Sequence, residues 1–201
     1  MSAPEVPARR RGVSDRVFKW VALGAGLCLV AFVVFVVVRG PAHRTGGGTA
    51  ALEAPPPATL HAGTVAPGFS LPALGGGIPV ALDAFRGKPV IVNFFASWCP
   101  DCRQELAAVA ATAAHAGTKV AVVGVDSNET SAADATGLLA AAHAHYPVAV
   151  DARAAVATKY LVTALPVSYF LDAHGRVVGA ALGPQTKASL QRWVARLEAA
   201  R

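Results

Sequence analysis

Cysteine is scarce in this chain, with three residues among 201. Cys28 lies in an apolar N-terminal segment, which leaves Cys99 and Cys102 for a folded domain. A structural zinc site normally needs four protein ligands, so histidines would have to complete any such site. His143 and His145 are the candidates, but residues two apart on a helix do not share a face. The sequence therefore argues against a metal site.

Charged residues are also few and do not indicate a nucleic-acid partner. They make up 15% of the chain, which has a net charge of +6. Residues 1–62 carry 7 Lys+Arg and 3 Asp+Glu (net +4), whereas residues 63–201 carry 11 and 9 (net +2). The positive charge thus belongs mostly to the flanks of the apolar N-terminal segment, and we infer no binding of nucleic acid from it.

One long uncharged run predicts a transmembrane helix. Residues 20–38 are 19 residues without a charge, enough at about 1.5 Å per residue to cross roughly 28 Å of hydrocarbon. Basic residues are more frequent before the run than after it, which predicts a cytoplasmic N-terminus at 1–19 and an extracytoplasmic remainder. A cleaved signal peptide is the alternative, but its apolar region is usually about 7 to 15 residues long. We therefore expect a single-pass signal anchor in the cell membrane.

Glycine and proline mark the next segment as a linker. Residues 39–64 include Gly46-Gly47-Gly48 and Pro55-Pro56-Pro57 and contain few large apolar residues. Such a composition cannot build a core, so it predicts a tether between the anchor and a folded domain at 65–201.

The domain at 65–201 alternates strand-like and helix-like segments. Continuous apolar runs at 89–95 and 119–126 predict strands that are buried on both faces, and residues 102–117 predict a helix that ends at a glycine. The pattern further predicts helices at 131–143, 154–161 and 186–197, and strands at 147–150, 167–172 and 177–182. This order predicts an α/β fold with a central mixed sheet, an antiparallel edge hairpin and helices on both faces.

Cys99 and Cys102 stand where the strand at 89–95 passes into a helix. Unpaired N–H groups and the helix dipole at this position lower the pKa of a thiol. The pattern favours Cys99 as an exposed nucleophile that attacks a substrate disulfide, and Cys102, shielded inside the helix, as the thiol that resolves the mixed disulfide. A purely structural bridge is disfavoured, because so short a loop removes little entropy from the unfolded chain.

Two neighbours of the cysteines each have two interpretations. The carboxylate of Asp101 opposes a nearby thiolate, which would raise the thiol pKa and make the couple more reducing; alternatively it complements the positive end of the helix. Trp98 either covers the active site as a lid or packs between surface and core.

The segment NFFASWCPDCRQE at 93–105 resembles the active-site strand, turn and helix of the thioredoxin-like superfamily. It is most similar to the membrane-anchored TlpA and ResA type of thiol-disulfide oxidoreductase, a redoxin-like branch. Segments 65–74, 80–99 and 160–179 are similar to other parts of that family, so the resemblance covers about residues 65–200. It implies a thioredoxin-like fold and no cofactor beyond a redox-active disulfide between the two cysteines.

The resemblance also assigns roles to residues outside the CxxC motif. Pro166 matches the family's cis-proline, which faces the dithiol and holds substrate backbone; by itself it would be a proline at the start of a strand. Leu165 and Val167 flank it, where a threonine often follows the proline, and this departure concerns partner specificity. Asn93 replaces a buried aspartate that accepts protons in cytosolic thioredoxins, which an amide cannot do. Glu105 matches an acidic residue that tunes the dithiol, or is an ordinary exposed helix glutamate.

These inferences predict an extracytoplasmic reductase of protein disulfides that receives electrons from a membrane dithiol donor. In the family the substrate is often an apocytochrome c, in cytochrome c maturation, but disulfide repair or oxidation of dithiols would use the same residues. A peroxiredoxin-like antioxidant protein is an alternative on the same fold, although Ala96 stands where its motif places a threonine. A Sco-type copper chaperone is another, although three residues usually separate its two cysteines, whereas two residues separate Cys99 and Cys102.

Overall fold

The computed structural model describes residues 58–200. The predicted cytoplasmic segment at 1–19, the predicted signal anchor at 20–38 and most of the predicted linker at 39–64 lie outside the described residues. Within the described part of the chain, no helix is both long enough and apolar enough to cross a membrane.

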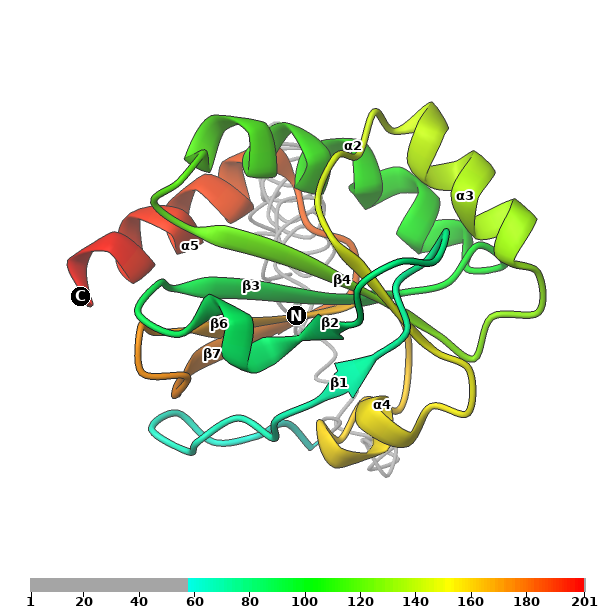
Figure 1. Ribbon diagram of the computed structural model, residues 1–201. Coiled ribbons are helices and arrows are strands. Elements are labelled where there is room, and N and C mark those ends of the chain that lie inside the picture. Colours follow the sequence, from blue (N-terminus) through cyan, green and yellow to red (C-terminus); the bar gives the residue numbers. More distant parts are fainter. Residues whose placement is uncertain (1–57, 201) are drawn as a thin grey trace, which may run out of the picture. The chain divides into compact units, whose positions relative to one another are not determined.

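A five-stranded mixed sheet forms the centre of the domain, in the order β5-β4-β3-β6-β7 (Figure 1). The central strand β3 (Val90–Phe95) pairs in parallel with β4 (Ala121–Ser127), and β4 pairs in parallel with β5 (Val148–Asp151). On its other side β3 pairs antiparallel with β6 (Val167–Leu171), which forms a hairpin with β7 (Val177–Leu182). The predicted mixed sheet with an antiparallel edge hairpin is confirmed.

Helices cover both faces of this sheet, as predicted. Helices α2 (Pro100–Ala116), α3 (Ala132–Ala141) and α5 (Lys187–Ala199) lie on one face, and the short α4 (Ala155–Lys159) lies on the other (Figure 1). Side-chain oxygens of Ser131 and Thr186, where two of the predicted helices begin, accept backbone N–H groups at the start of α3 and α5. Because these caps satisfy N–H groups that a helix leaves unpaired, they define where each helix begins.

A small antiparallel pair of strands was not predicted. It consists of β1 (Ser70–Leu71) and β2 (Val80–Ala81), and a 3-10 turn, η1 (Leu82–Phe85), follows it. Two-residue strands are too short to produce a hydrophobic period, so the sequence carries no signal for them.

Alternate residues of β3 supply the core on both sides of the sheet. On one face, Val90, Val92 and Phe94 pack in an apolar cluster with residues of α4. On the other face, Ile91 and Phe95 pack with residues of α2, α3 and α5. All five are buried, which explains why this strand is apolar throughout. The strand therefore fixes the position of the turn that follows Phe95.

Candidate active site

The junction between β3 and α2 places the two cysteines at the start of a helix. Cys99 is the N-cap of α2, Pro100 occupies the first turn, and Cys99 and Cys102 form a disulfide with their Cα atoms 5.3 Å apart. The Cys99 sulfur accepts the backbone N–H of Cys102 at 3.1 Å. A thiolate at Cys99 would keep this hydrogen bond and the favourable helix dipole, so the geometry favours Cys99 as the nucleophile.

The expectation that Cys99 is exposed is wrong for the disulfide form. Cys99 is 3% exposed and Cys102 is fully buried. Both pack in an apolar cluster with Phe95, Leu106 and Leu139, because the N-cap geometry turns the Cys99 sulfur inward over the first turn of the helix. Little of the Cys99 side chain is therefore accessible to a partner in the disulfide form.

The loop before Cys99 is held by three hydrogen bonds. The Ser97 N–H donates to Glu129 at 2.7 Å, and the Ser97 carbonyl accepts from the Arg103 guanidinium at 2.9 Å. The Trp98 indole N–H donates to the carbonyl of Asn128 at 3.0 Å, while the residue remains 49% exposed. Trp98 is thus a surface residue fixed against the β4–α3 loop, and its role as a lid stays a prediction.

Glu105 is buried at 1% exposure, so its interpretation as an ordinary exposed helix glutamate is wrong. Its carboxyl group accepts the Asn93 amide at 2.6 Å and the Gln185 backbone N–H at 2.8 Å. Burial raises the pKa of Glu105, and the two hydrogen bonds only partly offset this effect. Glu105 lies three residues after Cys102 in α2, a spacing that places both on one side of the helix.

Asn93 does not ionise, but it positions Glu105. Its amide donates both to Glu105 and, at 3.1 Å, to the hydroxyl of Ser168 on β6. The side chain is fully buried in β3 and lies in register with Ser168. The position at which the resemblance places a proton-accepting aspartate therefore holds an amide that donates a hydrogen bond to Glu105.

Pro166 belongs to a segment beside the dithiol, whereas Asp101 lies on the surface at the start of α2. The Leu165–Pro166 bond is cis, as the resemblance implied, and Pro166 is buried just before β6. Leu165 packs against the apolar cluster that contains both cysteines, which brings this segment beside the dithiol. Asp101 lies exposed in the first turn of α2, and its effect on the thiol stays a prediction.

The sequence interpretation missed two acidic residues beside this site. Asp126, at the end of β4, is fully buried, and Glu129 in the following loop holds Ser97. Burial and the neighbouring Glu129 raise the pKa of Asp126 to about 7. An aspartate that ends an otherwise apolar strand was a signal that could have been used.

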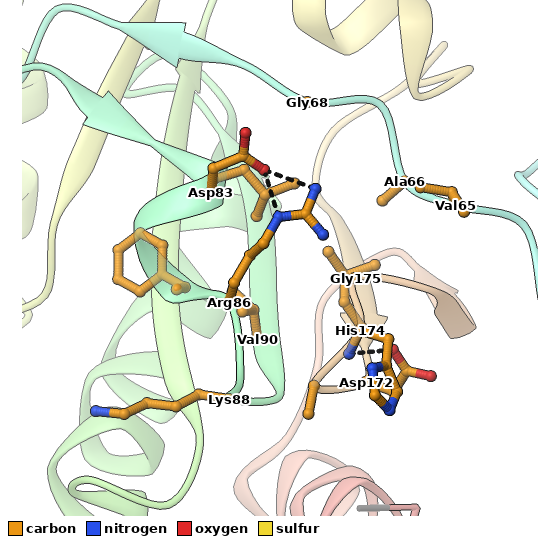
Figure 2. A pocket seen from close by; sticks show the side chains of 14 residues that line it. Val65, Ala66, Gly68, Asp83, Arg86, Lys88, Val90, Asp172, His174 and Gly175 are labelled. Carbon is orange, nitrogen blue, oxygen red and sulfur yellow. Dashed lines mark hydrogen bonds and ion pairs between the residues drawn. The ribbon is translucent and has the colours of Figure 1, made fainter.

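A pocket at another part of the domain lacks the cysteines (Figure 2). Arg86 and Asp83 form an exposed ion pair at 3.0 Å there, and Asp172 accepts the backbone N–H groups of His174 and Arg176 at 2.8 Å. These contacts are local and stabilise the turns at residues 83–86 and 172–176. Within residues 58–200, no three His, Cys, Asp or Glu side chains lie close enough together to hold a metal ion.

The fold and the site define a class: a thioredoxin-like protein with a disulfide at the start of the helix that follows its central strand. The family profile described as Redoxin matches residues 61–194. The chain belongs to the Redoxin family.

Similar proteins point to the same chemistry. The chain is 32% identical over 135 residues to thioredoxin-like protein YneN of Bacillus subtilis, which covers 66% of this chain and 78% of YneN. It is 29% identical over 139 residues to the thiol-disulfide oxidoreductase ResA of Bacillus thuringiensis, which covers 69% of this chain and 79% of ResA. A solved thiol:disulfide interchange protein from Chlorobium tepidum matches with a TM-score of 0.61 and 30% identity, over 70% of this chain and 99% of that one. The chain is accordingly a protein thiol-disulfide oxidoreductase of the ResA type.

Proposed function

We propose that the protein is an extracytoplasmic, membrane-anchored reductase of protein disulfides. The observation that carries this proposal is a buried carboxyl group, Glu105, one turn after the resolving Cys102. A carboxyl group with a raised pKa takes up a proton near neutral pH more readily than an ordinary glutamate, which suits a dithiol that must lose protons as it is oxidised.

The reduction proceeds by two thiol exchanges. The Cys99 thiolate, stabilised at the start of α2, attacks one sulfur of a substrate disulfide, forms a mixed disulfide and releases a substrate thiolate that takes a proton. Cys102 then transfers its proton to Glu105, and its thiolate attacks the Cys99 sulfur. The second substrate thiolate leaves and is protonated. Two electrons pass to the substrate, and the Cys99–Cys102 disulfide remains.

The proposed partners follow from this cycle. The disulfide must be reduced again, and a membrane protein with a dithiol would deliver the electrons without any additional cofactor in this chain. The proposed substrates are disulfides of extracytoplasmic proteins, including the haem-binding cysteine pair of an apocytochrome c. Pro166, cis and next to the cluster that packs on the cysteines, would hold the extended backbone of such a substrate.

The anchor is testable without reference to redox chemistry. The full chain is expected in the membrane fraction, resistant to alkaline extraction, and a version without residues 1–38 is expected in the soluble fraction. A reporter that is active only outside the cytoplasm, fused after residue 201, tests the predicted orientation. Recovery of the full chain in the soluble fraction would contradict the anchor.

The direction of electron flow is tested by the reduction potential of the Cys99–Cys102 pair. Equilibration of the purified protein with dithiothreitol, in a Cys28→Ser background so that only the pair reports, is expected to give a value near or below about −250 mV, in the range of thioredoxin. A value near about −120 mV, in the range of strong disulfide donors, would mean that the protein oxidises its partners. The reductase and cytochrome-maturation proposals would then be wrong.

A further inference from the structure

Asp126 is a buried carboxyl group that the thiol exchange described above does not use. It is fully buried, and no protein donor reaches either of its oxygens. An ionised carboxylate without donors is costly in such surroundings. Burial, assisted by the charge of Glu129, raises the pKa of Asp126 to about 7, so the group holds a proton at slightly acidic pH.

The position of Asp126 in the sheet places it on the same face as the dithiol. Asp126 pairs in register with Phe95 of β3, whose side chain packs against Cys99 and Cys102. The preceding residue, Val125, belongs instead to the apolar cluster on the α4 side. Because side chains alternate along a strand, Asp126 points to the α2 side, below the loop that carries the cysteines.

Glu129 connects Asp126 to that loop. Its charge acts on Asp126, and its carboxylate accepts the N–H of Ser97, two residues before Cys99, at 2.7 Å. Burial opposes its ionisation, but the hydrogen bonds from Ser97, Ser131 and Thr130 outweigh burial and lower the pKa of Glu129. The pair therefore holds one proton on Asp126 and one negative charge on Glu129.

Other charged groups near Asp126 are engaged elsewhere. From α2, Arg103 bonds the Ser97 carbonyl and Glu105 bonds Asn93 and Gln185. From α3, Asp134 is exposed, as is Asp101 at the start of α2. From β5, Asp151 pairs in register with Ser127 and accepts two N–H groups of α4, so it belongs to the opposite face. Glu129 is the charged group that acts on Asp126.

We propose that Asp126 is a positioning residue that couples its own protonation to the redox state of the Cys99–Cys102 pair. Protonated Asp126 donates a hydrogen bond to Glu129 and leaves a single negative charge at the Ser97 loop. Ionised Asp126 adds a second negative charge, which disfavours the Cys99 thiolate and makes the dithiol more reducing. The Asp126 proton exchanges with solvent, while the two electrons pass between the cysteines and an external dithiol or disulfide.

The coupling is reciprocal: formation of the thiolate must favour protonation of Asp126 by the same factor. The proposed coupling rests only on the thiol-disulfide activity, so it applies equally to a reductase and to an oxidase. Its failure is therefore distinguishable from failure of the proposed direction of electron flow.

The test is the pH dependence of the equilibrium between the protein and dithiothreitol, from pH 5.5 to 8.5, in the Cys28→Ser background. Asp126→Asn cannot ionise, and its amide can donate to Glu129 at every pH. At pH 8.5 this variant is expected to be reduced about threefold to tenfold more readily than the parent protein, and at pH 5.5 equally readily. In the parent protein, ionisation of Asp126 is expected to produce a step in the plot of this equilibrium against pH. Glu129→Gln is expected to move that step to lower pH, because it removes the negative charge that repels ionised Asp126.

Asp134→Asn is the matched control, because Asp134 lies with Ser97 and Arg103 around a groove beside the same loop but is exposed. Its curve is expected to follow the parent. Superposition of the Asp126→Asn curve on the parent curve would overturn the proposal. If that variant does not fold, NMR of ¹³C-aspartate in the parent protein decides: the Asp126 carboxyl must titrate at higher pH in the reduced form, and equal titration in both forms would overturn it.

Discussion

The sulfur of Cys99 occupies the capping position of α2, where it accepts the N–H of Cys102 at 3.1 Å. At the scale of single residues this contact distinguishes the two thiols, because Cys99 is the N-cap that precedes α2 whereas Cys102 lies inside its first turn. The proposed division of labour between a nucleophile and a resolving thiol rests on this asymmetry.

The asymmetry predicts different behaviour of two single variants. In the Cys28→Ser background, Cys102→Ser leaves a nucleophile that attacks but cannot release, so mixed disulfides with partner proteins are expected to accumulate. Cys99→Ser is expected to trap none. Non-reducing gels of cells that express each variant measure this, and equal trapping by both would contradict the assignment.

Glu105 is the residue on which proton transfer from Cys102 is proposed to depend. Glu105→Gln keeps the size of the side chain but cannot take up the proton, so resolution of the mixed disulfide is expected to slow about 100-fold at pH 7. Stopped-flow reduction of a model disulfide measures the resolving step. Glu198→Gln, at the far end of α5, is the control and is expected to leave the rate unchanged.

Asp126 also affects stability, with a sign that follows from its pKa. Its pKa of about 7 in the folded protein exceeds the ordinary value of 3.8, so the folded state binds the proton more tightly. This contribution to stability is complete below the ordinary value and is lost as pH rises to about 7. Between pH 5 and pH 8, the free energy of unfolding of the parent protein is expected to fall by up to about 3 kcal/mol relative to that of Asp126→Asn. Urea unfolding at both pH values measures this, and a constant difference would contradict it.

At the scale of elements, α5 and β7 are held together by a close approach at Gly179. A Cβ atom there would lie 2.6 Å from the ring of Trp193. That ring stacks on Phe170, with centroids 4.1 Å apart, and Arg196 lies over it at 4.7 Å. The glycine lets the indole lie flat against the sheet, so the ring has little room to move away.

Replacement of this glycine is therefore expected to loosen α5. Gly179→Ala is predicted to lower the free energy of unfolding by about 1 to 3 kcal/mol through overpacking. Gly137→Ala is the matched control, since no atom lies within 4 Å of its Cβ position in α3. The free energy of unfolding of the control is expected to rise by about 0.5 to 1 kcal/mol, because alanine has a higher helix propensity than glycine. Urea midpoints of both variants test this, and equal midpoints would contradict it.

At the scale of the whole domain, the site is assembled from separate parts of the chain. Asn93 and Glu105 come from β3 and α2, but Ser168 and Gln185 are 75 and 80 residues away from their partners in the sequence. Pairing of β3 with β6 brings the cis-proline segment to the cysteines, and pairing of β3 with β4 brings the Asp126 side chain to the same face. The sheet order therefore decides which polar groups surround the dithiol.

The sequence alone determined the elements of the central sheet and its helices, and it predicted the reacting atoms. Apolar runs and a glycine at the end of a helix predicted the strands and helices of the sheet core, because these signals are local. The CxxC spacing after a buried strand identified the thiols, since the helix start that activates Cys99 is itself a local feature.

Only the tertiary structure decided the surroundings of the thiols. It buried Cys99 in the disulfide form, turned Glu105 from a possible surface residue into a buried carboxyl group, and placed Asp126 beside Glu129. These outcomes depend on burial and on charges that approach across the sheet, and neither follows from the spacing of residues along a chain. The local sequence predicts which atoms react, and packing between distant segments sets the proton affinities around them.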